Sequence, residues 1–305
     1  MPVHNGAKYV AQAIESILGQ TYSDLELVIS DNASTDETET LCRRYQASDP
    51  RVRYYRNEQN VGASPNFGRV LELARGELFR WAAADDLLEP TCIERCVEAL
   101  DRDPSVVLAH TDVRIIDEAG EGILDYRYPP GHAASEDPVD RYRDVLLLDR
   151  WCAELFALVR ADVLRSTRGL DRYVASDRIL RAELALRGRY AMVGELLFLN
   201  RDHPERSVRA LPSHHLRAGW FDTSREGSRI LPHWRILGEY LKCIRRAPLT
   251  PGERWRSYLH TGRWLGIHMN WARLAADVVL AAFPGAWKPL LRANRSAERW
   301  LSRGP

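Results

Sequence analysis

The sequence predicts an α/β fold in which a mixed, mostly parallel sheet is flanked by helices and followed by a helical C-terminal extension. Three observations carry this prediction. Strand-like and helix-like segments alternate along the first hundred residues, the order that produces parallel sheets covered by helices. Polar clusters follow several of the strand-like segments. After about residue 215 the apolar residues recur only at helical spacing.

Local signals justify each element of the first hundred residues. Val10, Ile14 and Ile17 share one helix face, Ser34 or Thr35 is a suitable N-cap for the second helix, and Pro90 fits the first turn of the last. In chain order we expect a helix over 9–18, a strand over 25–30, a helix over 36–45, a strand over 52–56, a helix over 66–74, a strand over 78–84 and a helix over 90–100.

The remaining elements are expected at wider spacing. They are a strand over 106–116, a loop over 125–138, a helix over 139–148, a strand over 155–160, a helix over 178–186, a strand over 196–200, and helices over 231–246, 251–265 and 270–282. We therefore expect an α/β domain over residues 1–210 and a helical extension over 211–305.

Charge is distributed unevenly along the chain. The net charge of +1 does not indicate a nucleic-acid partner. Residues 201–305, however, carry 19 basic and 8 acidic residues and seven of the nine Trp, whereas the preceding part has a net charge of −10. A basic, Trp-rich segment is typical of peripheral contact with an anionic membrane. The alternative is a helical appendage with a solvated basic face and Trp in its core.

The cysteine content indicates a reduced protein. The five cysteines, at positions 42, 92, 96, 152 and 243, are odd in number and lack the spacing of a zinc site. The sequence has no signal-peptide pattern at its start and no apolar run of about 18 residues that would span a membrane. We expect a cytoplasmic location, with the inner face of the membrane as one alternative.

Asp85 and Asp86 form the most informative pair in the chain. They end an apolar segment, where adjacent carboxylates repel each other and lose hydration. A divalent cation, Mg²⁺ or Mn²⁺, would stabilise such a pair, and these metals commonly accompany phosphate groups. The alternative is that one Asp is the N-cap of the following helix.

Two other polar clusters also follow expected strands. They are Pro2–Asn5 and Asp31–Asp36. Since parallel sheets bind ligands beyond the carboxyl ends of their strands, we expect these clusters and Asp85–Asp86 to meet at one edge of the sheet.

Five ordered motifs over residues 1–210 resemble the family 2 glycosyltransferases. The motifs are Pro2-Val-His-Asn-Gly6, Val28-Ile-Ser-Asp-Asn-Ala-Ser-Thr-Asp36, Asn60-Val-Gly62 with Asn66, Trp81-Ala-Ala-Ala-Asp-Asp86, and Ser176-Asp177 followed by Arg201-Asp-His203. The resemblance implies the GT-A fold, whose first half is a Rossmann-like nucleotide-binding unit.

The resemblance implies a donor nucleotide site and a metal site. Backbone groups of Pro2, Val3 and His4 would hold the nucleotide, and Asp31 would accept hydrogen bonds from base or ribose. Asp85 would face ribose and metal, while Asp86 would ligate the divalent cation. Asn60 and Asn66 would order the loop near the donor.

The resemblance also implies the residues of the transfer step. Asp177 would be the catalytic base that takes a proton from the acceptor hydroxyl; its alternative is the N-cap of the helix over 178–186. Arg201 would pair with phosphate oxygens, and His203 would contact the metal or diphosphate. The loop over 125–138 would contact the acceptor.

Three departures from the family pattern stand out. Ala83 occupies a position where many relatives have a further Asp, and His4 occupies one where relatives usually have Tyr. Relatives also carry about four or five apolar residues before the Pro that is Pro2 here, so we expect the native start to lie upstream.

The implied activity is that of an inverting, metal-dependent hexosyltransferase. It would move a sugar from a nucleoside diphosphate to a hydroxyl of a carbohydrate or lipid-linked acceptor, in surface polysaccharide or glycolipid assembly. Two alternatives stay open at this point. One is a sugar-phosphate nucleotidyltransferase, and the other is a non-catalytic protein that binds nucleotide sugars or glycans on the same scaffold.

Overall fold

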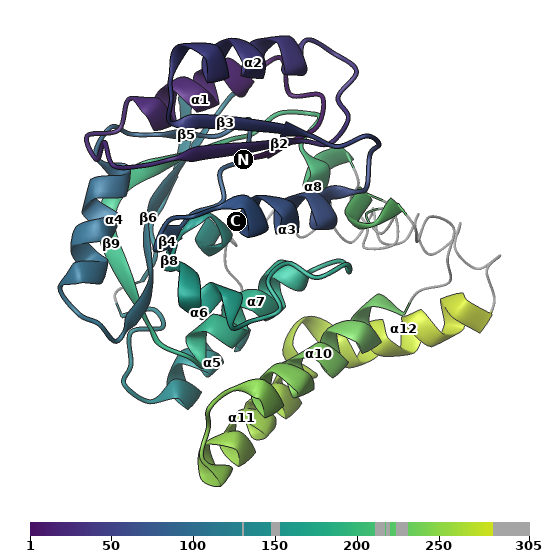
Figure 1. The fold of residues 1–305 in the computed structure, drawn as a ribbon. Helices are drawn as coiled ribbons and strands as arrows, with labels where there is room; N and C mark the ends of the chain where they lie inside the picture. The colour runs from purple at the N-terminus through teal and green to yellow at the C-terminus, as the bar shows by residue number, and fades with distance from the viewer. Residues whose placement is uncertain (130, 148–152, 211–216, 218–219, 224–230, 283–305) are drawn as a thin grey trace.

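Two sheets form the framework of the protein. The computed structural model describes residues 1–129, 131–147, 153–210, 217, 220–223 and 231–282. The first sheet is parallel throughout and contains β1 (Pro2–Val3), β2 (Leu27–Asp31) and β3 (Val52–Arg56) in that order. Helices α1 (Val10–Leu18) and α2 (Thr38–Ser48) cover one face of it, and α3 (Ala63–Leu73) covers the other (Figure 1). The expected α/β arrangement of the N-terminal part is confirmed.

The second sheet is mixed. Its order is β4-β8-β6-β9-β5, with β7 paired to β6. The long strands β6 and β9 run parallel, whereas the other pairs are antiparallel. The strands are β4 (Leu78–Phe79), β5 (Leu87–Leu88), β6 (Val106–Ile116), β7 (Gly122–Tyr126), β8 (Leu158–Arg160) and β9 (Arg189–Arg201). Because β5 pairs with the end of β9, the segment after Asp86 lies beside the strand that ends at Arg201.

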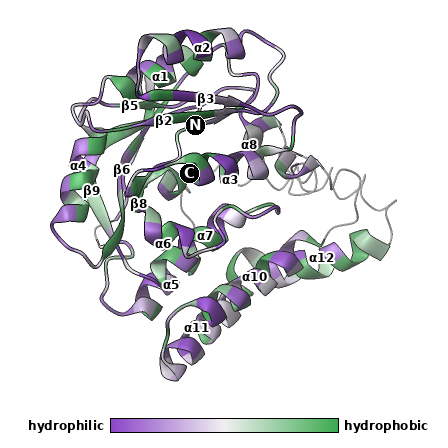
Figure 2. Cartoon of the chain, viewed as in Figure 1, coloured by the Kyte–Doolittle hydropathy of each residue, from purple (hydrophilic) through white to green (hydrophobic). Residues whose placement is uncertain are grey.

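Helices surround this sheet and extend from it. They are α4 (Cys92–Asp101), α5 (Pro138–Leu147), α6 (Ala161–Arg165), α7 (Ser176–Ala185), α8 (Ser207–Ala210), α10 (Pro232–Arg246), α11 (Pro251–Trp264) and α12 (Asn270–Ala282), with short 3₁₀ turns at η1 (Ala153–Phe156) and η3 (Ile267–Met269). The amphipathic pattern of α10 and α11 is visible in Figure 2, where hydrophilic and hydrophobic residues alternate along both helices.

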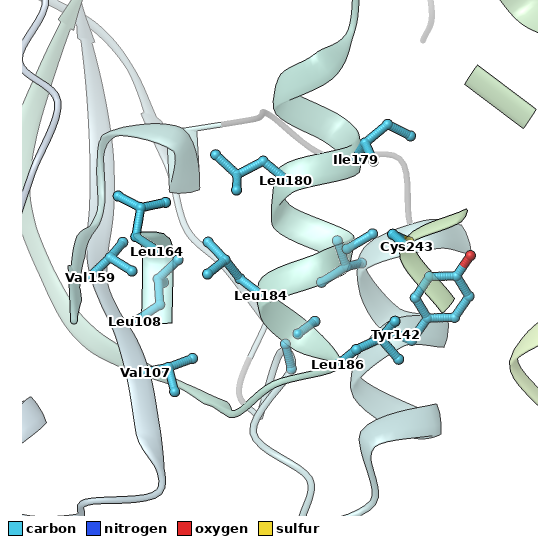
Figure 3. Close-up of a cluster of buried hydrophobic side chains, with 14 of the residues drawn as sticks. Val107, Leu108, Tyr142, Val159, Leu164, Ile179, Leu180, Leu184, Leu186 and Cys243 are labelled. Carbon is cyan, nitrogen blue, oxygen red and sulfur yellow. The ribbon is translucent and has the colours of Figure 1, made fainter. Parts of the chain in front are cut away.

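The largest hydrophobic cluster joins the second sheet to the C-terminal helices. Leu108 and Val159 of the sheet pack with Leu184 of α7, and Tyr142 of α5 lies near Cys243 of α10 in the same cluster (Figure 3). The hydroxyl of Tyr142 also pairs with Thr261 of α11 at 2.9 Å. The expected helices after residue 231 therefore share a core with the α/β part. A domain boundary at residue 210 stays a prediction.

Several boundaries differ from the expectation. The strand expected over 78–84 pairs only at Leu78–Phe79, the segment expected as a strand over 155–160 begins as the 3₁₀ turn η1, and β9 is longer than 196–200. Strand β7 overlaps the expected loop over 125–138 because it forms a hairpin with β6. Neither Ser34 nor Thr35 is the N-cap of α2, a position held by Glu37. Residue 148, the expected end of one helix, lies outside the described residues.

Candidate active site

Asp85 and Asp86 lie between β4 and β5, at the edge of the second sheet. The helix that follows them, α4, has Thr91 as its N-cap. The alternative in which one of these carboxylates begins that helix is therefore wrong. The Trp81 indole, which donates to the carbonyl oxygen of Phe67 at 3.0 Å, anchors the segment that leads to the pair. The two carboxylates differ in burial and in hydrogen-bond partners, and therefore in what each can bind.

Asp86 is buried and held by the end of β9. Both of its carboxylate oxygens accept hydrogen bonds from Nδ2 of Asn200 at 3.0 Å, and Oδ1 also accepts from the Arg201 backbone N–H at 2.8 Å. Burial, and then the nearby charge of Asp85, raise the pKa of Asp86 to about 7. With only 7% of the residue exposed, Asp86 is placed to fix the geometry of the pair. Its role as a metal ligand stays a prediction.

Asp85 is the more accessible member of the pair. Its side chain is 32% exposed, and its Oδ2 lies 2.9 Å from Nε2 of His203. Carboxylate oxygens are the ligands that suit Mn²⁺ or Mg²⁺, so Asp85 Oδ2 is the atom of this pair best suited to such a cation. The described residues contain no cluster of three or more His, Cys, Asp or Glu side chains suited to a metal. A cation at this pair would therefore take further ligands from a diphosphate and water, as Mg²⁺ commonly does in nucleotide sites.

Arg201 connects the pair to its surroundings. Its Nε donates to the carbonyl oxygen of Asp85 at 2.9 Å, and its terminal nitrogens donate to the carbonyl oxygens of Asp117 and Glu118 and to Oε1 of Gln12. The guanidinium also lies 4.7 Å from the centre of the Tyr9 ring. Since Arg201 is 1% exposed, this arrangement uses its donors within the protein. The predicted pairing of Arg201 with phosphate stays untested.

The loop after β1 is fixed by side chains at the start of α2. The backbone N–H groups of Asn5 and Gly6 donate to the hydroxyls of Ser34 and Thr38, and that of Ala7 donates to Asp36. Asp36 also accepts from the Thr38 N–H at 3.0 Å. Pro2 and Val3 are buried in β1, whereas the His4 side chain is exposed. The first two polar clusters therefore meet, as expected from their positions at strand ends.

Asp31 lies at the centre of this contact but is enclosed. One carboxylate oxygen accepts from the N–H and hydroxyl of Ser34, and the other accepts from the Tyr54 hydroxyl at 2.6 Å and from Arg56 at 3.0 Å. The residue is completely buried. In this structure Asp31 organises the loop over 31–34, and its contact with a base or ribose stays a prediction.

Asn60 joins the first cluster to the segment before α3. Its Nδ2 lies 3.2 Å from Nε2 of His4, and its Oδ1 accepts from Asn32 and from the Gly62 N–H. Asn66 is buried and exchanges hydrogen bonds with Ser30. Asn60 is thus exposed beside His4, whereas the buried Asn66 supports the loop through its hydrogen bonds to Ser30.

A cavity of about 260 Å³ is lined in part by Asn60. Its lining is mostly polar and includes Arg172, from the loop that leads to α7. The lining residues are Gln59, Asn60, Val61, Pro65, Arg172, Asp222 and Thr223. The cavity therefore lies between the Asn60 loop and the loop that precedes Asp177.

Asp177 is half-buried in the first turn of α7. The N-cap of this helix is Ala175, which has a φ of 67°, so the alternative that Asp177 is the cap is wrong. Asp177 makes no side-chain hydrogen bond within the described part of the chain. Ala175 belongs to the same buried cluster as Trp81, which links the start of α7 to the segment before Asp85. The role of Asp177 as the catalytic base stays a prediction.

Several residues of the site were not predicted. Asn200, which directly precedes the Arg201-Asp-His203 motif, holds Asp86, and Gln12 and Tyr9 of the α1 region contact Arg201. Position next to a motif could have indicated Asn200. Nothing in the sequence pattern indicates Gln12, because its partner lies 189 residues away.

Comparison with known proteins identifies the family that the N-terminal segment resembles. A family model described as glycosyl transferase family 2 matches residues 1–144. This segment, slightly less than half of the chain, therefore resembles glycosyl transferase family 2. Chondroitin synthase of Escherichia coli is 35% identical over 130 residues, which are 42% of this chain and 19% of that protein. An uncharacterized glycosyltransferase of Rickettsia typhi is 31% identical over 141 residues, 46% of this chain and 42% of that protein. The chain therefore spans less than half the length of these two relatives.

Solved structures show the same fold. The structure of S. aureus TarS in complex with UDP-GlcNAc has a TM-score of 0.59 at 15% identity, covering 87% of this chain and 71% of that one. The mannosyltransferase PcManGT of Pyrobaculum calidifontis, in complex with GDP-Man and Mn²⁺, has a TM-score of 0.55 at 20% identity, covering 97% and 78%. The predicted GT-A fold is thus confirmed.

Proposed function

We propose that this protein is an inverting, metal-dependent glycosyltransferase of the hexosyltransferase type. Its donor is a nucleoside-diphosphate sugar and its acceptor is a hydroxyl of a carbohydrate or a lipid-linked glycan. The observation that carries the proposal is the partly exposed Asp85, whose Oδ2 lies 2.9 Å from Nε2 of the buried His203, beside a rigidly held Asp86. A metal–diphosphate site requires a ligand group that is accessible and held on a fixed support, and the Asp85 carboxylate meets both conditions.

In the proposed reaction, Asp177 accepts the proton of the acceptor hydroxyl as that oxygen attacks the anomeric carbon. The new glycosidic bond forms on the face opposite the bond to the diphosphate, which breaks, so the anomeric configuration inverts. Asp85 and His203 would hold the divalent cation, Mg²⁺ or Mn²⁺, which when bound would neutralise charge on the departing nucleoside diphosphate. The loop over residues 2–7 and Asn60 position the nucleoside.

The first experiment measures thermal stability with a panel of nucleoside diphosphates and nucleotide sugars, with and without Mn²⁺. UDP- and GDP-sugars come first because TarS and PcManGT were solved with UDP-GlcNAc and GDP-Man. Ligands that bind the folded state raise the melting temperature. A metal-dependent rise with one nucleotide supports the donor site, and NMR of the transferred sugar then tests inversion. The absence of any rise across the panel would contradict the proposal.

We also propose that the protein acts in surface polysaccharide or glycolipid assembly at the cytoplasmic face of a membrane, which it contacts through residues 211–305. In the described part of that region, several Trp side chains are exposed, namely Trp220, Trp234, Trp255 and Trp271. Helix α12 places Trp271, Val278 and Val279 on an outer face, while Leu274 and Asp277 face α10. Figure 2 shows the hydrophobic residues at the end of this helix. No helix in the described ranges is long and apolar enough to cross a membrane.

Vesicle sedimentation tests this contact. We expect binding to vesicles that contain anionic lipid, weaker binding at high salt, and little binding to neutral vesicles. Replacing Trp271 by Ser should reduce binding, whereas replacing the buried Trp264 affects folding. Equal recovery with neutral and anionic vesicles would contradict the electrostatic part of the proposal.

A further inference from the structure

Lys8 lies at the border of the candidate active site, in the loop between β1 and α1. Its side chain is 57% exposed, and its ammonium forms an ion pair with the carboxylate of Glu118, which is 47% exposed. An exposed ion pair adds little to the stability of a fold, because water screens both charges. Because so little free energy holds the two side chains together, Lys8 can exchange Glu118 for another anion.

A short series of contacts connects Lys8 to Asp85. The Tyr9 hydroxyl donates to the same Glu118 oxygen at 3.2 Å, and the Lys8 ammonium lies 4.8 Å from the centre of the Tyr9 ring. That ring lies 5.1 Å from the His203 ring, and His203 contacts Asp85. Glu118 is also close enough to His203 that the two interact electrostatically. Lys8 and Glu118 are therefore near neighbours of the proposed metal–diphosphate site.

The turn that carries Glu118 is rigid in its backbone. Asp117 accepts from the N–H groups of Ala119 and Glu121, and Arg201 donates to the carbonyl oxygens of Asp117 and Glu118. Only the side chain of Glu118 remains adjustable. A donor that approaches Asp85 would thus meet a fixed turn with an exposed carboxylate and, beside it, an exposed ammonium.

In the part of the chain that the structure describes, two further cations near the Asp85–Asp86 pair are committed to protein groups. Arg201 is buried with its guanidinium on four protein acceptors, and Arg206 donates to Oδ1 of Asn200 at 2.7 Å. A diphosphate carries several negative charges, and Lys is a common phosphate ligand because its ammonium is a mobile point charge. Lys8 combines exposure with this mobility.

We propose that Lys8 binds the diphosphate of the donor, and that its ammonium leaves the carboxylate of Glu118 to do so. The inference rests on the proposed function, because it requires a nucleoside diphosphate at the Asp85–His203 pair. In the absence of donor, Glu118 holds Lys8 away from the carboxylate of Asp85. When a diphosphate binds, Lys8 turns to it, and its positive charge stabilises the leaving group as the anomeric bond breaks.

Calorimetric titration of three variants tests the inference, with UDP and GDP as probes, each in the presence of Mn²⁺, and with uridine and guanosine as uncharged comparisons. Lys8→Gln should weaken binding of the nucleoside diphosphate about tenfold and leave nucleoside binding unchanged. Glu118→Gln should tighten diphosphate binding by about two- to fivefold, because it removes the competing carboxylate. Lys242→Gln is the matched control, since Lys242 is 52% exposed and pairs with Glu239 on α10; it should bind like the wild type.

The opposite changes in diphosphate affinity expected for Lys8→Gln and Glu118→Gln distinguish direct binding by Lys8 from a purely structural role. Loss of the Lys8–Glu118 pair alone would change both variants in the same direction and would affect the nucleoside as well. Diphosphate binding by Lys8→Gln that equals that of the wild type would overturn the inference and leave the proposed function intact. A wild-type protein that binds neither diphosphate would overturn both.

Discussion

The Nε2 atom of His203 lies 2.9 Å from Oδ2 of Asp85, although the two residues are 118 positions apart in the chain. The end of β9 creates this contact, because Asn200 and Arg201 first fix Asp86 and the backbone of Asp85. Asp85, the partly exposed member of the pair, is thus positioned by buried neighbours. Of the two adjacent carboxylates, Asp85 is the proposed metal ligand and Asp86 supports it. Mutation of each residue can therefore separate the two contributions.

Asp85→Asn should abolish metal-dependent nucleotide binding and preserve the fold. The side chain is isosteric and 32% exposed, so the melting temperature without ligand should change little. Loss of groups that merely support metal ligands costs about 10–100-fold, and loss of a ligand should therefore weaken the Mn²⁺-dependent binding of UDP or GDP by at least about 100-fold. Asp125→Asn, which alters an exposed carboxylate paired with Arg114, is the control. A variant that keeps the full Mn²⁺-dependent rise in melting temperature would exclude Asp85 as a ligand.

Asp86→Ala should act mainly on stability. It leaves Nδ2 of Asn200 and the Arg201 N–H without the carboxylate they bind, and each buried unpaired group costs about 1–3 kcal/mol. We expect the free energy of unfolding in urea to fall by about 3 kcal/mol. Asn200→Ala should have an effect in the same direction, and the double variant should lose less than the sum of the two, since they share one contact. If the loss of unfolding free energy in the double variant equalled the sum of the two single losses, the Asp86–Asn200 contact would contribute nothing to stability.

The sequence contained enough information to predict that the first two polar clusters would meet. Parallel strands end at a common edge, and the clusters after β1 and β2 are indeed joined by hydrogen bonds from Asn5 and Gly6 to Ser34 and Thr38. The strand expected over 78–84 was wrong beyond Phe79. An apolar run indicates burial, and here side-chain bonds, such as that of Trp81 to Phe67, secure the segment in place of a strand ladder.

The burial of Arg201 could not be predicted from its motif. An Arg beside Asp and His in sequence indicates an exposed phosphate ligand, whereas the structure encloses it between Gln12, Tyr9 and the turn at Asp117. Those partners lie at least 83 residues away in the chain. A single sequence carries no periodic signal for such pairs, so the distinction between a ligand-binding cation and a supporting one appears only in three dimensions.

Gly62→Ala should destabilise the protein, because two features at this position require glycine. Its φ is +90°, which residues with a Cβ rarely adopt, and an added Cβ would lie 2.8 Å from the carbonyl oxygen of Phe221. We expect the free energy of unfolding to fall by about 2 kcal/mol or more. Gly238 is the matched control: it lies within α10 with open space around its Cβ position, so Gly238→Ala should stabilise by up to about 1 kcal/mol. Equal effects of the two changes would contradict the described packing of residues 60–62 against 221–223.

His110 should make the protein less stable in mild acid. It lies in β6 with its ring edge-on to Tyr128, at 4.4 Å between centroids, and near His132 and Glu154. Within the described part of the chain, neither of its ring nitrogens has a hydrogen-bond partner. Burial is the main cause that lowers the pKa of His110 from 6.5 to about 4, with a smaller contribution from His132, while the charge of Glu154 opposes the shift.

The sign of the effect follows from proton uptake. Between pH 6.5 and 4 the unfolded chain binds a proton at His110 that the folded protein does not, so the free energy of unfolding falls as the pH is lowered through this range. The lowered pKa corresponds to about 3 kcal/mol in total. His110→Phe removes the titrating group from an apolar position, and its stability in urea should therefore depend less on pH between 6.5 and 4 than that of the wild type. Parallel pH profiles for the two proteins would show that His110 is charged, or solvated, in the folded state.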